Sequence, residues 1–260
     1  MRIEPLFQLK SDAVDSTNAK RARSVGRLEG AIMRMFTKAA SVSEVQVLDE
    51  SFRLITLTGP ALREVRWVPG MKVQLALGGW TARTYTPIEW DAGSGVTRLL
   101  AFVHGDAPGA VWVRGLRAGD ACTLFGPRDS IDLTKLSRPG LLFGDETSIG
   151  LAHALRSTSG AAQGVSIVLE VTSKPRTEAV LTRMQIGDAV LIERKPDDAH
   201  LPSLESVVAK QLQERAISGC VLSGKATSIQ RLNKQLRAAG LTGKQIHTKA
   251  YWAPGKAGLD

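Results

Sequence analysis

The hydrophobic pattern of the chain changes its period once, near residues 135–140, and this change limits the fold more than any other feature. Before it, short stretches of alternating apolar and polar residues are separated by turn residues, as in 42–48 and 52–58. After it, apolar runs such as 165–171 alternate with longer segments of helical period. Closely spaced alternating strands are typical of a compact antiparallel barrel. Alternation of strand and helix is typical of a parallel sheet with crossover helices.

The sequence therefore predicts two domains of the β + α/β class, since 260 residues exceed the usual size of one domain. Residues 1–38 are expected to form a polar arm with a short amphipathic helix at 30–36. Residues 39–137 are expected to form an antiparallel β-barrel, and residues 138–260 a parallel-sheet α/β domain with a C-terminal tail. Further strands are expected at 73–77, 96–104, 121–125, 141–143, 189–192 and 219–222, and helices at 148–157, 204–214 and 227–239.

The composition is that of an ordinary globular protein, with 43% hydrophobic and 23% charged residues. No apolar run approaches the roughly 18–20 residues that span a bilayer, and the first 20 residues lack the apolar core of a secretory signal. We therefore expect a cytoplasmic location without membrane insertion. Cys122 and Cys220 are too few for a four-cysteine iron–sulfur cluster or a disulfide framework. We expect both to be buried as small hydrophobic residues.

The formal net charge of +9 favours anionic partners, which include nucleic acids, acidic membranes, dinucleotides and anionic metal chelates. The chain has no recognisable nucleic-acid-binding module, and its basic residues do not form one block. We therefore expect no nucleic-acid partner. His153, His200 and His247 have no partner at metal-ligand spacing, which favours structural or solvated roles and predicts no metal site.

The first motif that suggests ligand binding is Arg83-Thr84-Tyr85-Thr86-Pro87. In a strand, Arg83 and Tyr85 share one face, and Thr84 and Thr86 share the other. A guanidinium can clamp phosphate oxygens, and an aromatic ring beside it can stack on a planar heterocycle. Taken alone, the motif fits a surface arginine beside a core tyrosine equally well.

The second motif is His104-Gly105-Asp106-Ala107-Pro108-Gly109-Ala110-Val111-Trp112. It follows a strand and opens a helix, because proline suits a first helical turn. Small residues let the chain approach a ligand closely, and the free amides at a helix N-terminus bind phosphate. A tight turn into a connecting helix is the alternative interpretation.

Taken together, the motifs resemble those of the siderophore-interacting proteins, a branch of the ferredoxin-reductase-like flavoenzymes without an iron–sulfur cluster. The resemblance covers nearly the whole chain from about residue 41, and it depends on the order and spacing of several short motifs. These are Arg83-x-Tyr85-Thr86, His104-Gly105-x-x-Pro108-x-x-x-Trp112, Gly126-Pro127, Gly144-Asp145-Glu146-Thr147 and Tyr251-Trp252-x-x-Gly255.

The resemblance implies a role for each matching residue. Arg83 would hold the FAD phosphates, Tyr85 would pack against the isoalloxazine or ribityl chain, and Thr86 would lie near flavin N5. The other implied cofactor contacts are Thr84, His104, Gly105, Trp112 and the amides around Ala107, Gly109 and Ala110.

On the nicotinamide side, Asp145, Glu146 and Thr147 would border the ring, with Ser223 and Trp252 nearby. Ser223 stands where related reductases often have cysteine, and this departure puts a catalytic role at that position in doubt. Lys225 stands where many siderophore-interacting proteins have an acidic residue, so the local charge differs there.

Two basic regions are relevant to ligand choice. Ser173 and Arg176 follow a buried strand where a nucleotide ribose would lie, and they favour the 2′-phosphate of NADPH over NADH. A solvated basic loop is the alternative. In the C-terminal third, Lys225, Lys249 and Lys256 could draw an anionic ferric chelate toward the flavin, or could serve solubility alone.

The function implied is an FAD-dependent NAD(P)H oxidoreductase that reduces ferric siderophores or other ferric chelates and so releases Fe(II). The cofactors carry the redox chemistry, and no side chain is assigned as a catalytic acid or base. One alternative is a reductase that serves a protein partner or free flavin. Another is a non-catalytic protein that binds a flavin or a ferric chelate. The sequence does not indicate which chelate is bound, the oligomeric state or the role of the arm.

Overall fold

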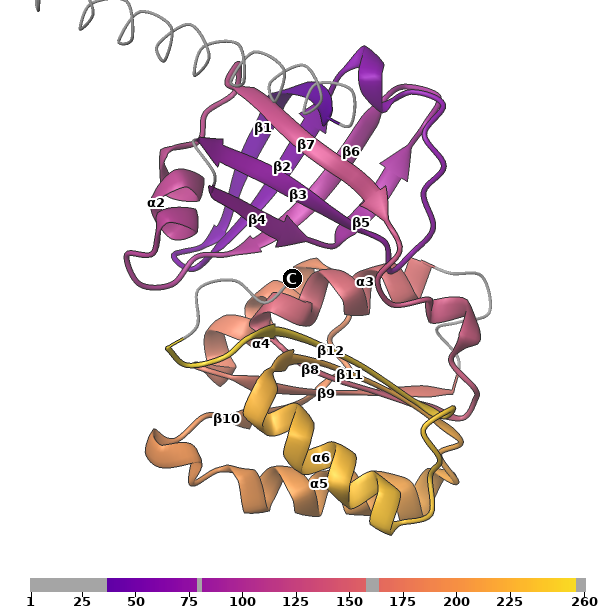
Figure 1. Ribbon diagram of the computed structural model, residues 1–260. Coiled ribbons are helices and arrows are strands. Elements are labelled where there is room, and N and C mark those ends of the chain that lie inside the picture. Colours follow the sequence, from indigo (N-terminus) through magenta and orange to yellow (C-terminus); the bar gives the residue numbers. More distant parts are fainter. Residues whose placement is uncertain (1–36, 79–80, 158–163, 256–260) are drawn as a thin grey trace, which may run out of the picture. The chain divides into compact units, whose positions relative to one another are not determined.

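The computed structural model describes residues 37–78, 81–157 and 164–255 and arranges them in two sheets (Figure 1). The first sheet along the chain is antiparallel and the second is parallel. The described residues from 39 onward belong to one compact unit. The helix expected at 30–36 and the candidate residue Lys256 lie outside the described residues.

Within the described residues, the antiparallel sheet has seven strands in the order β4-β3-β7-β1-β2-β6-β5. They are β1 (Thr37–Asp49), β2 (Phe52–Thr58), β3 (Lys72–Gly78), β4 (Thr81–Tyr85), β5 (Pro87–Asp91), β6 (Val96–Phe102) and β7 (Ala121–Arg128). The two edge strands, β4 and β5, are consecutive in the chain, and the single residue Thr86 separates them. The sheet must therefore curl until its edges meet, which confirms the antiparallel barrel domain.

Strands β2 and β6 are buried on both faces because their alternate side chains enter two different cores. Ile55, Leu57 and Leu99 pack inside the barrel. Leu54 and Leu100 point the other way and join a cluster with side chains of the α/β domain. Helix α2 (Pro108–Gly115) adds further apolar side chains to the barrel core. The strands that build the barrel thus also attach it to the second domain.

The parallel sheet has the order β10-β9-β8-β11-β12, and all its neighbouring strands pair in parallel. Its strands are β8 (Gly140–Asp145), β9 (Val165–Val171), β10 (Val190–Glu193), β11 (Gly219–Lys225) and β12 (Ile246–Trp252). The crossover helices are α3 (Ile149–Ser157), α4 (Lys174–Arg183), α5 (Leu201–Arg215) and α6 (Ala226–Ala238). Single-turn 3-10 helices occur at Pro60–Leu62, Leu133–Lys135, Glu146–Ser148 and Pro196–Asp198. None of the described helices is long and apolar enough to cross a membrane.

Helices cover both faces of the parallel sheet, with α3 and α4 on one face and α5 and α6 on the other (Figure 1). The alternating side chains of the buried strands supply both cores. Leu142 and Leu169 pack with α3 and α4, whereas Leu141 and Phe143 pack with α5 and α6. The sheet of crossover units predicted from the sequence is therefore confirmed.

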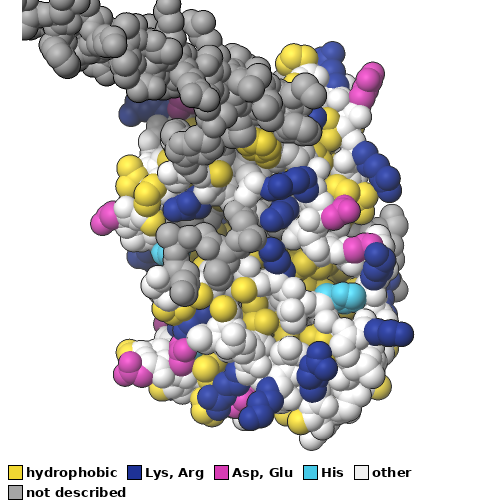
Figure 2. Space-filling view, viewed as in Figure 1, with side chains coloured by type: hydrophobic (Ala, Val, Ile, Leu, Met, Phe, Trp, Pro, Cys, Tyr) yellow, Lys and Arg dark blue, Asp and Glu magenta, His cyan; other side chains and the backbone are white. Residues whose placement is uncertain are grey.

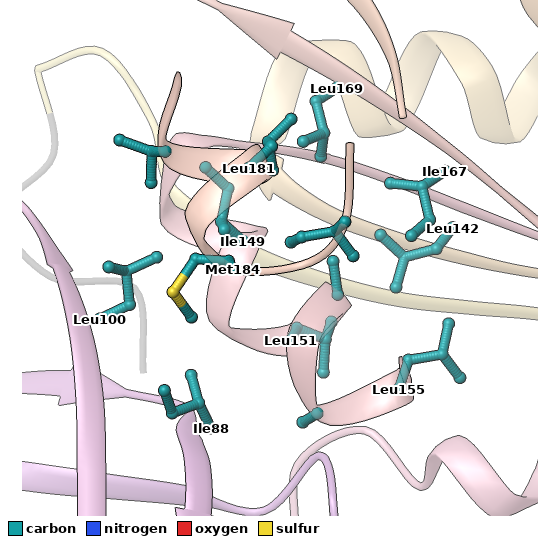
Figure 3. Close-up of a cluster of buried hydrophobic side chains, with 14 of the residues drawn as sticks. Ile88, Leu100, Leu142, Ile149, Leu151, Leu155, Ile167, Leu169, Leu181 and Met184 are labelled. Atoms are coloured by element: carbon teal, nitrogen blue, oxygen red, sulfur yellow. The ribbon is translucent and has the colours of Figure 1, made fainter. Parts of the chain in front are cut away.

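One hydrophobic cluster contains side chains from both sheets (Figure 3). Ile88 and Leu100 come from barrel strands, and they belong to the same cluster as Ile149 and Leu151 of α3 and Met184 after α4. The contact between the domains therefore includes core side chains of both.

Three elements depart from the sequence expectation. Strands β5 and β12 and helix α4 were not predicted, and α4 begins at residues 174–176, for which a solvated basic loop was the alternative to ribose contacts. A proline near the start of α4 explains the last difference, because the first turn of a helix leaves its N–H groups unpaired. The proline therefore starts this helix and does not mark a loop.

Both cysteines are buried free thiols, as expected. Burial raises the pKa of Cys122 to about 11, with a further contribution from the nearby charge of Asp120. Burial also raises the pKa of Cys220 to about 12. Since the thiolate is the reactive form, neither residue is a nucleophile near neutral pH.

Candidate functional site

The strand order of the parallel sheet reverses at β8. Sheets of α/β proteins bind their ligands at such a topological switch point. The chain moves outward from β8 through β9 and β10, and then continues on the other side of β8 with β11 and β12. The carboxyl ends of β8 and β11 carry Asp145 and residues 223–225. The structure thus brings these candidate nicotinamide residues together at the switch point.

Asp145 is fully buried at the end of β8 and accepts three hydrogen bonds. Its Oδ1 accepts from the backbone N–H of Thr147 at 2.8 Å and from the Thr147 hydroxyl at 2.5 Å. Its Oδ2 accepts from Nε1 of Trp252 at 2.6 Å. Burial raises the pKa of Asp145 to about 6, against the lowering effect of the bonds from Thr147 and Trp252. The carboxyl group thus links the ends of β8 and β12.

The Ser223-Gly224 pair has a structural role at this point. Ser223 is fully buried, and its hydroxyl bonds the hydroxyl of Ser148 at 2.9 Å and the carbonyl oxygen of Phe143 at 3.3 Å. Gly224 has a φ of +95°, and a Cβ there would overlap the carboxyl group of Asp145. The serine hydroxyl is therefore engaged inside the protein, and the glycine makes room for the aspartate.

Arg194, directly after β10, links the ends of neighbouring strands, although no pattern in the sequence singled it out. It forms an ion pair with Glu146, which is almost fully buried. Its Nη2 also donates to the hydroxyl of Thr172 at 2.8 Å, and its Nη1 donates to the carbonyl oxygen of Glu170 at 3.2 Å. The guanidinium lies 5.8 Å from the ring centroid of Trp252. Arg194 thus links the carboxyl ends of β8, β9 and β10.

Lys225 does not present a free charge at the surface. Its ammonium group is largely buried and forms an ion pair with Asp198, and it lies 5.8 Å from the ring centroid of Trp252. The indole therefore has two cations near it, a favourable arrangement for an aromatic ring. Lys249 lies on β12 and is partly exposed.

A buried polar cluster beneath this site was not expected from the sequence. Glu170 is fully buried near the end of β9. Its carboxylate accepts from the hydroxyl of Ser228 at 2.8 and 2.9 Å and lies 2.9 Å from Nε2 of His200. The three residues are far apart in the chain, so no local pattern could identify them. His200 has the structural role that its isolation in the sequence predicted.

The two barrel motifs meet in space at Arg83 and Gly109. A Cβ on Gly109 would lie 3.0 Å from Cγ and 3.1 Å from Nε of Arg83, so the arginine side chain packs directly on α2. Arg83 Nη1 donates to the carbonyl oxygen of Ala82 at 2.8 Å. The glycine is needed because a larger side chain would displace the arginine.

The start of α2 leaves its backbone amides available. Ala107 is the N-cap residue and has no side chain to cap the helix, and Pro108 occupies the first turn. The preceding turn is fixed by Arg114, which donates to the carbonyl oxygen of Gly105 at 2.7 Å and to the carboxylate of Asp106 at 2.8 Å. The free amides of α2 therefore lie next to the Arg83 guanidinium, which is the geometry of an anion site.

Of the aromatic residues of the two motifs, Tyr85 and Trp112 pack against the barrel core, whereas His104 is exposed. Burial raises the pKa of Tyr85 to about 12, although the charge of Arg83 lowers it, so the phenol stays neutral. His104 is exposed, and its ring centroid lies 5.0 Å from that of Phe102. Trp112 is partly buried and packs against the barrel core.

Thr86 connects the barrel strand to the switch point. Its side chain is hydrogen-bonded to the hydroxyl of Tyr251, whose pKa is raised to about 12 by burial. A Cβ on Gly150, at the start of α3, would lie 3.1 Å from the carbonyl oxygen of Thr86. The strand that carries Arg83 and Tyr85 therefore ends against both α3 and β12. Thr84, in the same strand, is partly exposed.

The candidate ribose residues lie at the start of α4. Ser173 is the N-cap residue and makes no capping bond with its side chain. Arg176 is exposed and forms an ion pair at 2.6 Å with Glu50, in the turn between β1 and β2. Ser173 therefore closely follows the end of β9, whereas the guanidinium of Arg176 is paired with a carboxylate of the barrel domain.

The sequence matches no known family model and no curated protein. The fold, however, matches several solved structures. A siderophore utilization protein from T. fusca matches with a TM-score of 0.68 at 18% identity, over 86% of this chain and 95% of that chain. The siderophore-interacting protein SipS from Aeromonas hydrophila matches with a TM-score of 0.67 at 16% identity, over 85% and 93% of the two chains.

A ferredoxin reductase in carbazole 1,9a-dioxygenase matches with a TM-score of 0.63 at 16% identity, over 83% of this chain and 69% of that chain. Another structure of that reductase is described as its FAD apo form. The chain thus has a ferredoxin-reductase-like fold, an antiparallel sheet domain followed by a parallel α/β domain. This confirms the predicted fold class and, at the level of fold, the resemblance to siderophore-interacting proteins.

Proposed function

We propose that this chain is an FAD-dependent NAD(P)H oxidoreductase that reduces ferric siderophores or other anionic ferric chelates. The observation that carries the proposal is the convergence of three features of the chain. Arg83 packs on the uncapped start of α2, and the same strand ends at Thr86 against the switch point of the parallel sheet. One short strand thereby joins the surface suited to phosphate and the switch point, where a nucleotide would bind.

The residues present fit a pyrophosphate-bearing flavin. The guanidinium of Arg83 and the amides of residues 107–110 form one positively polarised surface, suited to phosphate oxygens. Gly109 allows the Arg83 side chain to lie against the start of α2, because a Cβ at this position would crowd it. Tyr85 supplies a neutral ring in the same strand for contact with the isoalloxazine or ribityl chain.

The switch-point residues fit a nicotinamide site. Asp145 and Thr147 fix one another at the end of β8, and Asp145 also fixes the indole of Trp252. These bonds fix the carboxyl ends of β8 and β12 relative to each other. A nicotinamide ring bound there would be held in one orientation, and no proton transfer is needed. Bound FAD would supply the redox chemistry, accepting a hydride from the nicotinamide and releasing electrons one at a time to Fe(III).

The charge of the chain supports an anionic acceptor. The formal net charge is +9, and Figure 2 shows Lys and Arg side chains spread over the visible face and not gathered in one block. A dispersed positive field raises the local concentration of anionic chelates without defining one site. Ferric iron is held by hard oxygen donors far more firmly than ferrous iron, so its reduction would release the metal.

A visible spectrum of the purified protein tests the proposal directly. We expect a yellow protein whose flavin absorbance bleaches on anaerobic mixing with NADPH and returns when a ferric chelate is added. A protein that takes up no FAD would overturn the proposal. Bleaching without return would exclude that chelate, and rates with a cytochrome or free flavin as acceptor would then identify a reductase of the alternative kind.

Replacing Arg83 with glutamine is expected to weaken FAD binding by about 10- to 100-fold, because a charge-assisted hydrogen bond contributes about 1.5–3 kcal/mol. The measurement is titration of the apoprotein with FAD, followed by flavin fluorescence. The matched control is Arg63→Gln, which removes an exposed arginine that bonds the carbonyl oxygen of Ser94. Equal FAD affinity in the two variants would contradict the assignment of Arg83.

We propose NADPH as the preferred nucleotide. An acidic residue near the end of the second strand accepts from the ribose 2′-hydroxyl in NAD-binding sheets. Here Glu170 holds that place, but its carboxylate is fully buried and engaged by Ser228 and His200. Ser173 and Lys174 instead present a hydroxyl and a charge suited to a 2′-phosphate.

Replacing Ser173 with glutamate is expected to shift the ratio of kcat/KM for NADPH over NADH toward NADH by about tenfold or more. The new carboxylate would repel the 2′-phosphate and could accept from a 2′-hydroxyl, at about 1.4 kcal/mol per factor of ten. Steady-state kinetics with both nucleotides measure this ratio. Ala179→Glu, at an exposed position later in α4, is the control and should leave the ratio unchanged.

A further inference from the structure

Helix α4 is bonded to the β1–β2 hairpin of the barrel near both of its ends. In its first turn, Nη1 of Arg176 pairs with the carboxylate of Glu50 at 2.6 Å. In its last residue, Nη1 of Arg183 donates to the carbonyl oxygen of Leu48 at 2.7 Å. The two arginines are seven residues apart, a spacing that places them on one face of a helix. Helix α4 therefore turns this face toward the barrel, although it follows a strand of the parallel sheet.

The turn that carries Glu50 is held in place by hydrogen bonds within the barrel. Nη1 of Arg53 donates to the carbonyl oxygens of Asp49 at 2.6 Å and of Glu50 at 3.2 Å. The backbone N–H of Ser51 donates to Oδ1 of Asp49 at 3.1 Å. The carbonyl oxygen of Ser51 accepts from the N–H of Val103 at 2.7 Å. The barrel thus sets the position of Glu50 beside α4.

The ion pair of Arg176 with Glu50 can be exchanged for another anion. The side chain of Arg176 is 48% exposed and that of Glu50 is 77% exposed, so the pair is open to water. Exposed ion pairs are weak. A phosphate monoester carries nearly two negative charges at neutral pH, and it can bind a guanidinium at two points. The 2′-phosphate of NADPH, bound at the start of α4, would therefore draw Arg176 away from Glu50.

Glu50 opposes a 2′-phosphate in either of two arrangements. If the guanidinium leaves Glu50, the ion pair is lost when the phosphate binds. If the guanidinium binds both anions, the carboxylate and the phosphate come close together and repel each other. The ribose of NADH has no charge at this position, so its binding leaves the pair of Arg176 and Glu50 intact. Glu50 therefore acts on the one group that distinguishes the two nucleotides.

We propose that Glu50 is a specificity-determining residue, which competes with the ribose 2′-phosphate for Arg176 and so limits the preference for NADPH over NADH. Binding of a 2′-phosphate releases the start of α4 from the β1–β2 turn, whereas a nucleotide without this phosphate leaves the contact in place. The inference rests on the proposed function, because it takes the start of α4 as the ribose site. Glu50 itself belongs to the barrel, in a segment for which no nucleotide contact was expected.

Adenosine 2′,5′-bisphosphate and adenosine 5′-monophosphate test the inference, because they differ by the 2′-phosphate and undergo no redox reaction. Calorimetry on the full-length protein as purified gives both dissociation constants, at low ionic strength, where exposed charges are screened least. Glu50→Gln is expected to tighten binding of the bisphosphate by about two- to fivefold, the value of one exposed ion pair. Arg176→Gln is expected to weaken it by about tenfold. Neither substitution should change binding of the monophosphate.

The double variant separates competition for Arg176 from general repulsion. In the Arg176→Gln background, Glu50→Gln should have no further effect. The control is Glu44→Gln, at an exposed position earlier in β1, which should leave both affinities unchanged. The inference is overturned if Glu50→Gln does not tighten the bisphosphate, or tightens it equally without Arg176. If the bisphosphate binds Glu50→Gln no more tightly than the monophosphate does, the proposed NADPH preference is overturned as well. The flavin spectrum tests the reductase activity separately.

Discussion

Glu170→Ala is expected to lower the free energy of unfolding by about 3–5 kcal/mol, among the largest effects of any single substitution in this chain. The carboxylate is fully buried, and its removal leaves the hydroxyl of Ser228 and Nε2 of His200 without their partner. Buried polar groups that lose a partner bear the full cost of desolvation. Urea denaturation followed by tryptophan fluorescence measures the loss.

The matched control is Glu205→Ala. Glu205 forms a two-point ion pair with Arg231, at 2.7 and 2.9 Å, on the exposed side of α5 and α6. An exposed pair of this kind contributes at most about 1 kcal/mol. A loss no larger for Glu170→Ala than for Glu205→Ala would show that the buried cluster does not stabilise the end of β9.

Asp145 is expected to make the folded protein less stable as the pH rises through about 6. The pKa of Asp145 is about 6 in the folded protein and 3.8 for an aspartate in the unfolded chain. The folded state therefore binds the proton more tightly. The stabilisation is complete below about pH 4 and is lost as the pH rises through about 6. A shift of about two pKa units corresponds to about 3 kcal/mol.

Asp145→Asn isolates this contribution, because the asparagine side chain does not titrate. The unfolding free energy of the unaltered protein minus that of the variant should fall by about 3 kcal/mol from about pH 4 to pH 8. Denaturation curves across that range give the difference. Asp132→Asn is the control: hydrogen bonds from Thr134 and Lys135 lower the pKa of Asp132, so no change is expected above pH 5. A difference that rises with pH for Asp145→Asn would contradict the burial argument.

The parts of the fold that follow local pattern could be predicted from the sequence. Strand β9 is mostly apolar and β2 alternates, so each carries a recognisable strand pattern. Strand β12 was missed because it lies at the edge of the sheet, where only Ile246 is buried among its described side chains. Strand β5 was missed because Pro87 suggests a turn. A proline is tolerated there because it is the first residue of an edge strand.

In the candidate site, too, the contacts between local motifs could be predicted, and those between residues far apart in the chain could not. The pairing of Arg83 with the start of α2 was expected, because both motifs carry the residue types that phosphate binding needs. The bond between Thr86 and Tyr251, and the ion pair of Arg194 with Glu146, join residues that are far apart in the chain. Such contacts depend on how the strands are ordered in the sheet, and strand order is set by the whole fold.

The hydrophobic cluster that contains Ile88, Leu100 and Met184 has a consequence for chimaeric proteins. Joining this barrel to the α/β domain of another protein of the same fold would exchange one side of a packed core while leaving the other unchanged. Steric mismatch would follow unless the residues facing Ile88 and Leu100 were transplanted as well. The protein should therefore tolerate exchange of its surface loops far better than exchange of its halves.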